Sequence, residues 1–78
     1  MTMVPLSFMN SGDRVKIEHI CGSGYLTKTL GQLGIAIGEE LTVIQKANES
    51  VIVRIKESRY ALGTGAASMV LVKLIKGA

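Results

Sequence analysis

Hydrophobic and charged residues alternate along the segment Arg14–Ile17. Val15 and Ile17 fall on one face of an extended chain, and the two basic residues of the segment fall on the other. This alternation predicts a half-buried β-strand, because successive side chains of a strand point to opposite sides of the sheet. Ile20 is out of phase with the pattern, so the regular alternation is interrupted before it.

Leucine then recurs at helical spacing. Leu26, Leu30 and Leu33 stand at positions i, i+4 and i+7, which lie on one face of a helix. Gly34 follows at the place where a helix C-terminal cap belongs. Gly31 lies inside the segment and costs about 1 kcal/mol relative to alanine. The pattern predicts a short helix that depends on the packing of its leucines for stability.

The second half of the chain is rich in β-branched and aliphatic residues, which favour strands. Four strands are predicted, at residues 41–45, 51–56, 59–62 and 70–74. In the second of these, Val51, Val53 and Ile55 share one face and predict its buried side. Residues 47–50, A-N-E-S, predict a hairpin loop between the first two strands, and Gly63 and Gly65 predict a tight corner.

The predicted order of elements is one strand, a short helix and four more strands. We therefore expect a mainly β fold, a small SH3-like five-stranded antiparallel barrel with one short helix in its first long loop. Closing the sheet in this way avoids long exposed edges. An OB-type barrel is the alternative. The whole chain, residues 1–78, is predicted to form a single domain, with residues 1–10 extended or partly ordered.

Chain length limits the chemistry that the protein can perform. A chain of 78 residues must commit nearly all of its aliphatic side chains to one core. A deep catalytic cavity is therefore not expected, and neither is enzyme activity. The longest run without a charged residue, 60–72, has thirteen residues, whereas a spanning helix needs about 20. We therefore expect no insertion into a membrane.

The single cysteine and the N-terminus both bear on the compartment. Cys21 cannot form an intramolecular disulfide, which fits a reducing environment. The first ten residues contain Pro5 and polar residues and lack the basic start and apolar stretch of a signal peptide. We therefore expect a cytoplasmic protein.

A net charge of +3 suits an acidic partner without requiring one. The basic residues are scattered, and Tyr and Phe together number three, whereas proteins that bind nucleic acid usually cluster Lys and Arg and often add aromatic residues. Nucleic acid is not the expected partner, but a small basic barrel that binds it is kept as an alternative. The glycines at 22, 24 and 31 match neither common nucleotide-binding loop, so no cofactor is predicted.

His19 and Cys21 are the candidate metal ligands. They are two positions apart, so on an extended strand both side chains would project to the same face. Imidazole and thiolate both bind soft divalent metals, but two ligands do not close a site. The pair predicts at most an adventitious or dimer-bridging divalent metal, and the alternative is a partly buried thiol beside a solvated imidazole. No Asp or Asn stands nearby to orient a Cys–His catalyst.

A candidate docking surface follows the predicted helix. An apolar run stands between Gly34 and Gly38, and exposed apolar residues mark interaction sites when they gather in a patch. Polar residues on the helix face opposite the leucines would form its rim. The candidate partner-binding residues are Tyr25, Lys28, Gln32, Ile35, Ala36 and Ile37. The alternative is ordinary core packing for the apolar run and ordinary solvation for the rim.

The same region carries a family pattern. The run of residues 30–38, L-G-Q-L-G-I-A-I-G, followed by L-T-V-I at 41–44, resembles the L-x-x-L-G-[hydrophobic]-x-P-G segment of FeoA, a small accessory protein of bacterial ferrous iron transport. Positions near both ends also agree with that family: Leu6-Ser7, Gly12, Ala61-Leu62-Gly63, Ala67 and Val70-Leu71-Val72. Ile37 departs from the pattern, because the family commonly has proline there. The turn before Gly38 thus loses a fixed φ and gains an apolar side chain.

The resemblance implies an SH3-like cytosolic domain that assists or regulates FeoB, a membrane transporter with a cytosolic GTPase domain. A similar module occurs fused to iron-dependent repressors. This interpretation predicts a non-catalytic accessory module. A further alternative is that the chain is a module that responds weakly to divalent metal. Self-association is also expected to be available to it, because a short barrel exposes strand edges that a second copy can pair with.

Overall fold

The computed structural model describes residues 2–75. Within these residues the chain forms six strands, two α-helices and one 3-10 helix. In chain order they are β1 (Val4–Pro5), η1 (Leu6–Phe8), β2 (Arg14–Ile20), α1 (Gly24–Gln32), β3 (Glu40–Lys46), β4 (Ser50–Ile55), β5 (Ser58–Gly63), α2 (Thr64–Ser68) and β6 (Val70–Leu74).

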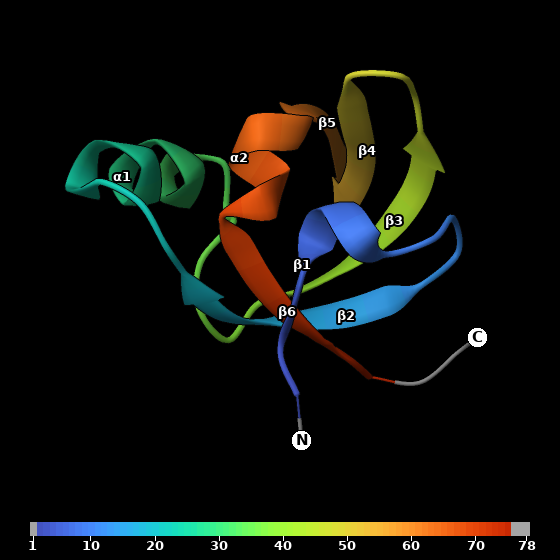
Figure 1. Cartoon of the computed structure of the whole chain (residues 1–78), viewed down its shortest axis with the longest axis horizontal. Helices are drawn as coiled ribbons and strands as arrows, with labels where there is room; N and C mark the ends of the chain where they lie inside the picture. Colours follow the sequence, from blue (N-terminus) through green and yellow to red (C-terminus); the bar gives the residue numbers. More distant parts are fainter. Residues whose placement is uncertain (1, 76–78) are drawn as a thin grey trace.

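The six strands form one antiparallel sheet in the order β1-β6-β2-β3-β4-β5. The sheet curls so that β6 and β5 lie on two sides of α2 (Figure 1), and α2 packs against β5, η1 and β6. This helix covers the place where the curled sheet does not close through strand pairing. The predicted mainly β, SH3-like antiparallel barrel, with a short helix in its first long loop, is confirmed.

The alternating hydrophobic residues of β2 and β4 supply a large part of the core. Val15 and Ile17 of β2 are fully buried, and so are Val51 and Val53 of β4. A register shift between Ile17 and His19 interrupts the pairing of β2 with β6. This irregularity explains why Ile20 is also buried although it is out of phase with the start of the strand. Within residues 2–75, no polar or charged residue is buried.

Two short elements differ from the sequence-based prediction. The first ten residues were expected to be extended or partly ordered, and from residue 2 onward they contain β1, which pairs with β6, and η1, which buries Leu6 completely. β1 is the sixth strand, beyond the five predicted. The tight corner expected at Gly63 and Gly65 is wrong, since the chain there enters α2 and buries Ala67. Elements of two and five residues are too short to show a hydrophobic period.

Helix α1 ends as its sequence predicts. Gly34 has a φ of +90°, and its amide donates to the Gly31 carbonyl at 3.0 Å. The Ile35 amide donates to the Leu30 carbonyl at 2.9 Å. These two bonds form a Schellman motif, which satisfies the last carbonyls of the helix and requires a left-handed residue that glycine supplies most cheaply. At the other end, Ser23 Oγ accepts a hydrogen bond from the Leu26 amide at 3.3 Å.

Candidate docking surface

Five of the six predicted partner-binding residues lie at least partly at the surface. Tyr25 is 80% exposed, Ile37 is 62% exposed, and Lys28 and Gln32 are also exposed. Ala36 is partly buried. These residues belong to α1 and to the loop between α1 and β3, so the structure keeps them in the region where the sequence placed them.

Ile35 is the exception, and its assignment to the docking surface is wrong. Its side chain is fully buried and belongs to the hydrophobic core. The reason is the Schellman motif at the end of α1, in which the residue after the left-handed glycine folds back onto the last turn of the helix. Leu30, whose carbonyl accepts the bond from Ile35, is buried with it.

Ile37 points outward because of the next turn. The Glu39 amide donates to the Ala36 carbonyl at 3.0 Å, and Gly38 has a φ of +94°. A left-handed third residue is the signature of a type II turn, in which proline is common at the second position. Ile37 occupies that second position. The turn is also bonded to β2, because the Gly38 amide donates to the Ile17 carbonyl at 2.8 Å. The loop is therefore held in place although it lacks the expected proline.

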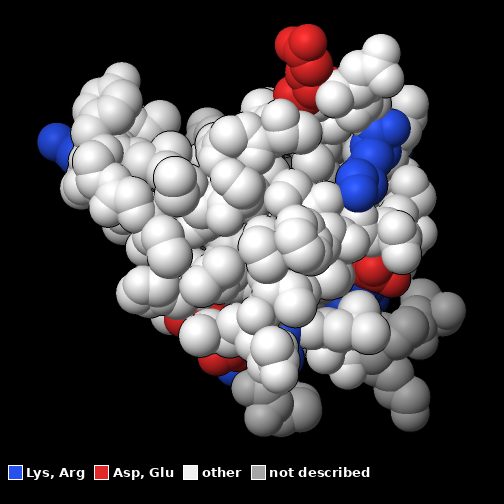
Figure 2. Space-filling model, in the orientation of Figure 1, with Lys and Arg blue, Asp and Glu red and all other residues white. Residues whose placement is uncertain are grey.

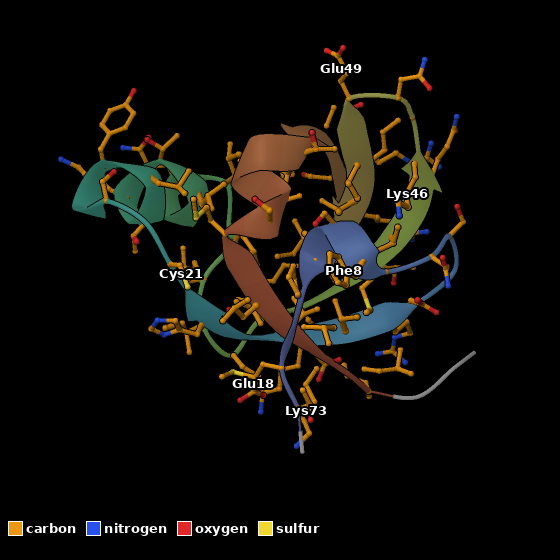
Figure 3. The ribbon with its side chains drawn as sticks, in the orientation of Figure 1. Phe8, Glu18, Cys21, Lys46, Glu49 and Lys73 are labelled. Atoms are coloured by element: carbon orange, nitrogen blue, oxygen red, sulfur yellow. The ribbon has the colours of Figure 1, made fainter. Side chains whose placement is uncertain are left out.

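The exposed apolar side chains lie on a surface with few charges. Figure 2 shows one face of the molecule almost entirely white, with charged side chains only near its margins. In the same orientation this face contains α1, α2, η1 and β6 (Figure 1). Phe8 lies near its middle, whereas Lys46, Glu49, Glu18 and Lys73 lie toward the edges (Figure 3). We call this surface the uncharged face.

Two residues of the uncharged face were missed at the sequence level. Phe8 is 68% exposed, and Met69, between α2 and β6, is 41% exposed. Phe8 is the only phenylalanine and lies in a run of twelve residues without a charge, which is the signal that could have identified it. Met69 lies in the uncharged run 60–72, but its position directly before the predicted strand 70–74 gives no indication of which way its side chain faces.

Helix α1 is joined to the rest of this face through one tight turn. Gly22 has a φ of +98°, and a Cβ there would lie 3.2 Å from Leu26 Cδ2 and 3.9 Å from Met69 Sδ. The Cys21 amide donates to the Met69 carbonyl at 2.7 Å. The chain therefore leaves β2 and enters α1 beside the end of α2, so that the two helices belong to one surface.

The candidate metal ligands are only two in number. His19 is exposed, and Cys21 is partly buried just beyond the end of β2. Within residues 2–75, no group of three or more His, Cys, Asp or Glu side chains is arranged to hold a metal ion. The weak divalent-metal site at His19 and Cys21 therefore stays a prediction.

No helix in the stretch from residue 2 to residue 75 has the length and apolar character to span a bilayer. The fold and the exposed apolar side chains together define a small β-barrel domain with a candidate docking face.

Comparison with known proteins identifies the family. The FeoA domain family matches residues 4–74, and the chain belongs to it. Over 71 residues it is 35% identical to the protein named "Putative Fe(2+) transport protein A" of Methanocaldococcus jannaschii, covering 91% of this chain and 87% of that protein. The resemblance to FeoA predicted from the sequence is confirmed.

Solved structures agree with this assignment. A crystal structure of the iron uptake regulatory protein FeoA is 29% identical, with a TM-score of 0.84, covering 94% of this chain and 97% of that one. A manganese-dependent transcriptional repressor in complex with manganese contains the same fold, with a TM-score of 0.89 at 19% identity. The match covers 96% of this chain but 38% of the repressor, and it supports the fold alone.

Proposed function

We propose that this chain is a non-catalytic accessory protein of ferrous iron uptake, and that it acts by docking on the cytosolic part of a FeoB-type transporter. Its place in the FeoA family and the name of its relative, a Fe(2+) transport protein, support the role in iron uptake. The proposal adds two points to this role. The chain docks on a FeoB-type transporter, and it is located in the cytoplasm.

The observation that carries the docking step is the uncharged face. Phe8, near the middle of this face, is 68% exposed (Figure 3), and Tyr25 of α1 and Ile37 of the loop after α1 are 80% and 62% exposed. A partner that covers them removes apolar area from water, at about 25 cal/mol for each Å². Aromatic residues are also enriched among the residues that dominate binding energies. Docking there would change transport by favouring the transporter conformation to which the chain binds more tightly.

Binding of variants to the purified cytosolic region of the transporter tests the proposal. Ile37→Ser removes an exposed apolar side chain from the candidate surface, and we expect it to weaken binding at least fivefold. Ala61→Ser is the matched control, because Ala61 is an exposed apolar residue of β5, which is not among the elements of the uncharged face, and it should bind as the unchanged chain does. Equal binding of all three proteins, or no binding at tens of micromolar, would refute docking through this face.

The proposal includes no resident cofactor. His19 and Cys21 offer two donor atoms to a divalent metal, and a structural zinc site takes four ligands. We expect calorimetry with zinc or ferrous iron to show no stoichiometric heat. Stoichiometric heat that is lost in a His19→Ala variant would instead establish a metal-responsive module.

A further inference from the structure

A second, chemically different surface lies on the sheet. Where β2, β3 and β4 adjoin, a groove of about 390 Å³ is lined by Arg14, Glu40, Leu41, Thr42, Arg54 and Lys56. We call it the basic groove. Thr42 of β3 is the pairing partner of Arg14 on one side and of Arg54 on the other. Side chains of directly paired residues share one face of the sheet, so these three residues form a row across three strands.

The register explains why the sequence shows no basic cluster. Arg14 and Arg54 are 40 positions apart in the chain, and each stands next to apolar residues of its own strand. Antiparallel pairing of β3 with both neighbours brings them to the same face of the sheet, with Thr42 between them. Lys56 joins them from the turn after β4, where its φ is +56°. Scattered charges in the sequence therefore become one positive site in the fold.

The cations of the basic groove have hydrogen-bond donors left over. Arg14 Nη2 lies 3.0 Å from Glu40 Oε1, and both side chains are about half exposed. Arg54 Nε donates to the Lys56 carbonyl at 3.4 Å. A guanidinium has five N–H donors, and within residues 2–75 no other hydrogen bond from the Arg14, Arg54 or Lys56 side chains occurs. Three cations therefore face one carboxylate, with most of their N–H groups available to a ligand.

We propose that the basic groove binds an acidic peptide segment of a partner protein. Arginine pairs with carboxylates in a planar, bidentate geometry. The two arginines stand at the two ends of the row, with Thr42 between them. Glu40 supports a peptide over a nucleic acid, because its carboxylate accepts hydrogen bonds from peptide N–H groups, whereas a phosphodiester backbone offers no donor. The residues lining the groove include no aromatic side chain, so bases would find no stacking platform there. This inference concerns a different surface and does not rest on the docking proposed above.

An NMR titration of the labelled full chain tests this inference. The probe is a blocked peptide, Gly-Glu-Glu-Glu-Gly, and its control is the same peptide with glutamine in place of glutamate. We expect saturable shifts at the amides of Arg14, Thr42, Arg54 and Lys56, with a dissociation constant on the order of 1 mM that rises with salt. Equal shifts with the glutamine peptide, or no saturable shift up to about 10 mM, would overturn it.

Two variants separate a built site from general charge attraction. Arg54→Ala should weaken binding of the glutamate peptide about fivefold, the effect of about 1 kcal/mol for an exposed ion pair. Lys28→Ala is the control, because Lys28 is an exposed cation of α1 that does not line the groove, and it should change binding less than twofold. Equal losses in both variants would contradict a defined site.

Two further probes identify the ligand class. Inorganic phosphate and a short oligothymidylate are titrated under the same conditions. We expect both to bind more weakly than the glutamate peptide. Tighter binding of either one at these residues would overturn the peptide assignment and give the groove a phosphate ligand instead.

Discussion

The amide of Ile35 donates to the carbonyl of Leu30 at 2.9 Å, and this bond decides which side of the loop after α1 faces the core. It folds Ile35 back over the last turn of the helix, where it is fully buried with Leu30. Ile37, two residues later, lies in the next turn and is 62% exposed. Two chemically identical residues therefore have opposite roles, one in stability and one in the candidate docking surface.

This difference is directly measurable. Ile35→Ala should lower the free energy of unfolding by about 3 kcal/mol, because a buried side chain is lost and a cavity remains. Ile37→Ala should change it by less than about 0.5 kcal/mol, because the residue is exposed. Urea denaturation of the two variants gives both values. Similar losses for the two would show that Ile37 is also packed in the core.

Alanine at Gly31, inside α1, and at Gly34, just after it, should change the stability of the protein in opposite directions. Gly34 has a φ of +90°, so Gly34→Ala should cost about 1–2 kcal/mol through backbone strain. Its new Cβ would meet only Ile55 Cδ1, at an ordinary 3.9 Å. Gly31 is inside the helix, and a Cβ there meets nothing within 4 Å. Gly31→Ala should therefore stabilise the protein by up to about 1 kcal/mol. Thermal unfolding of both variants checks the opposite signs.

The N-terminal cap of α1 should also contribute to stability. Ser23 Oγ accepts from the Leu26 amide, so Ser23→Ala should cost about 1 kcal/mol. Ser23→Asp keeps an acceptor oxygen and adds a negative charge near the positive end of the helix dipole, and it should retain full stability. The same unfolding measurement serves here. An alanine variant as stable as the unchanged chain would show that the cap contributes nothing, and an equal loss in both variants would show that the acceptor oxygen is not the cause of the loss.

Restoring the family's proline gives a further test of the loop. Ile37 is the second residue of the turn Ala36–Glu39, a position that suits the fixed φ of proline. Ile37→Pro should raise the free energy of unfolding by about 0.4–1 kcal/mol, since it restricts the unfolded chain. Destabilisation instead would mean that the backbone at Ile37 differs from that of a type II turn. Ala36→Pro is a contrasting variant, and it should not stabilise the protein because Ala36 is the first residue of the turn, where the fixed φ of proline is not called for.

Sequence patterns predicted the parts of the fold that are long enough to show a period. The alternation at Arg14–Ile17 identified β2, and the leucine spacing with Gly34 identified α1 and its end. Helix α2 and strand β1 were missed, because neither has enough residues for a hydrophobic period to appear.

The candidate sites were less predictable, for a different physical reason. Ile35 and Ile37 are the same residue type and have nearly the same sequence neighbours. Only the hydrogen bonds of two consecutive turns make one buried and the other exposed. The basic groove depends on strand register, which joins Arg14 to Arg54 through Thr42. Such long-range pairing is a property of the sheet and leaves no local signal in the chain.

We propose that this protein acts through the surface of α1 and the turn that follows it. Chemical-shift mapping of the labelled chain against the transporter's cytosolic GTPase region is the decisive test. We expect perturbed amides between Tyr25 and Gly38, together with those of Phe8 and Met69. Perturbations confined to residues 51–56 of the sheet, with α1 unaffected, would contradict it.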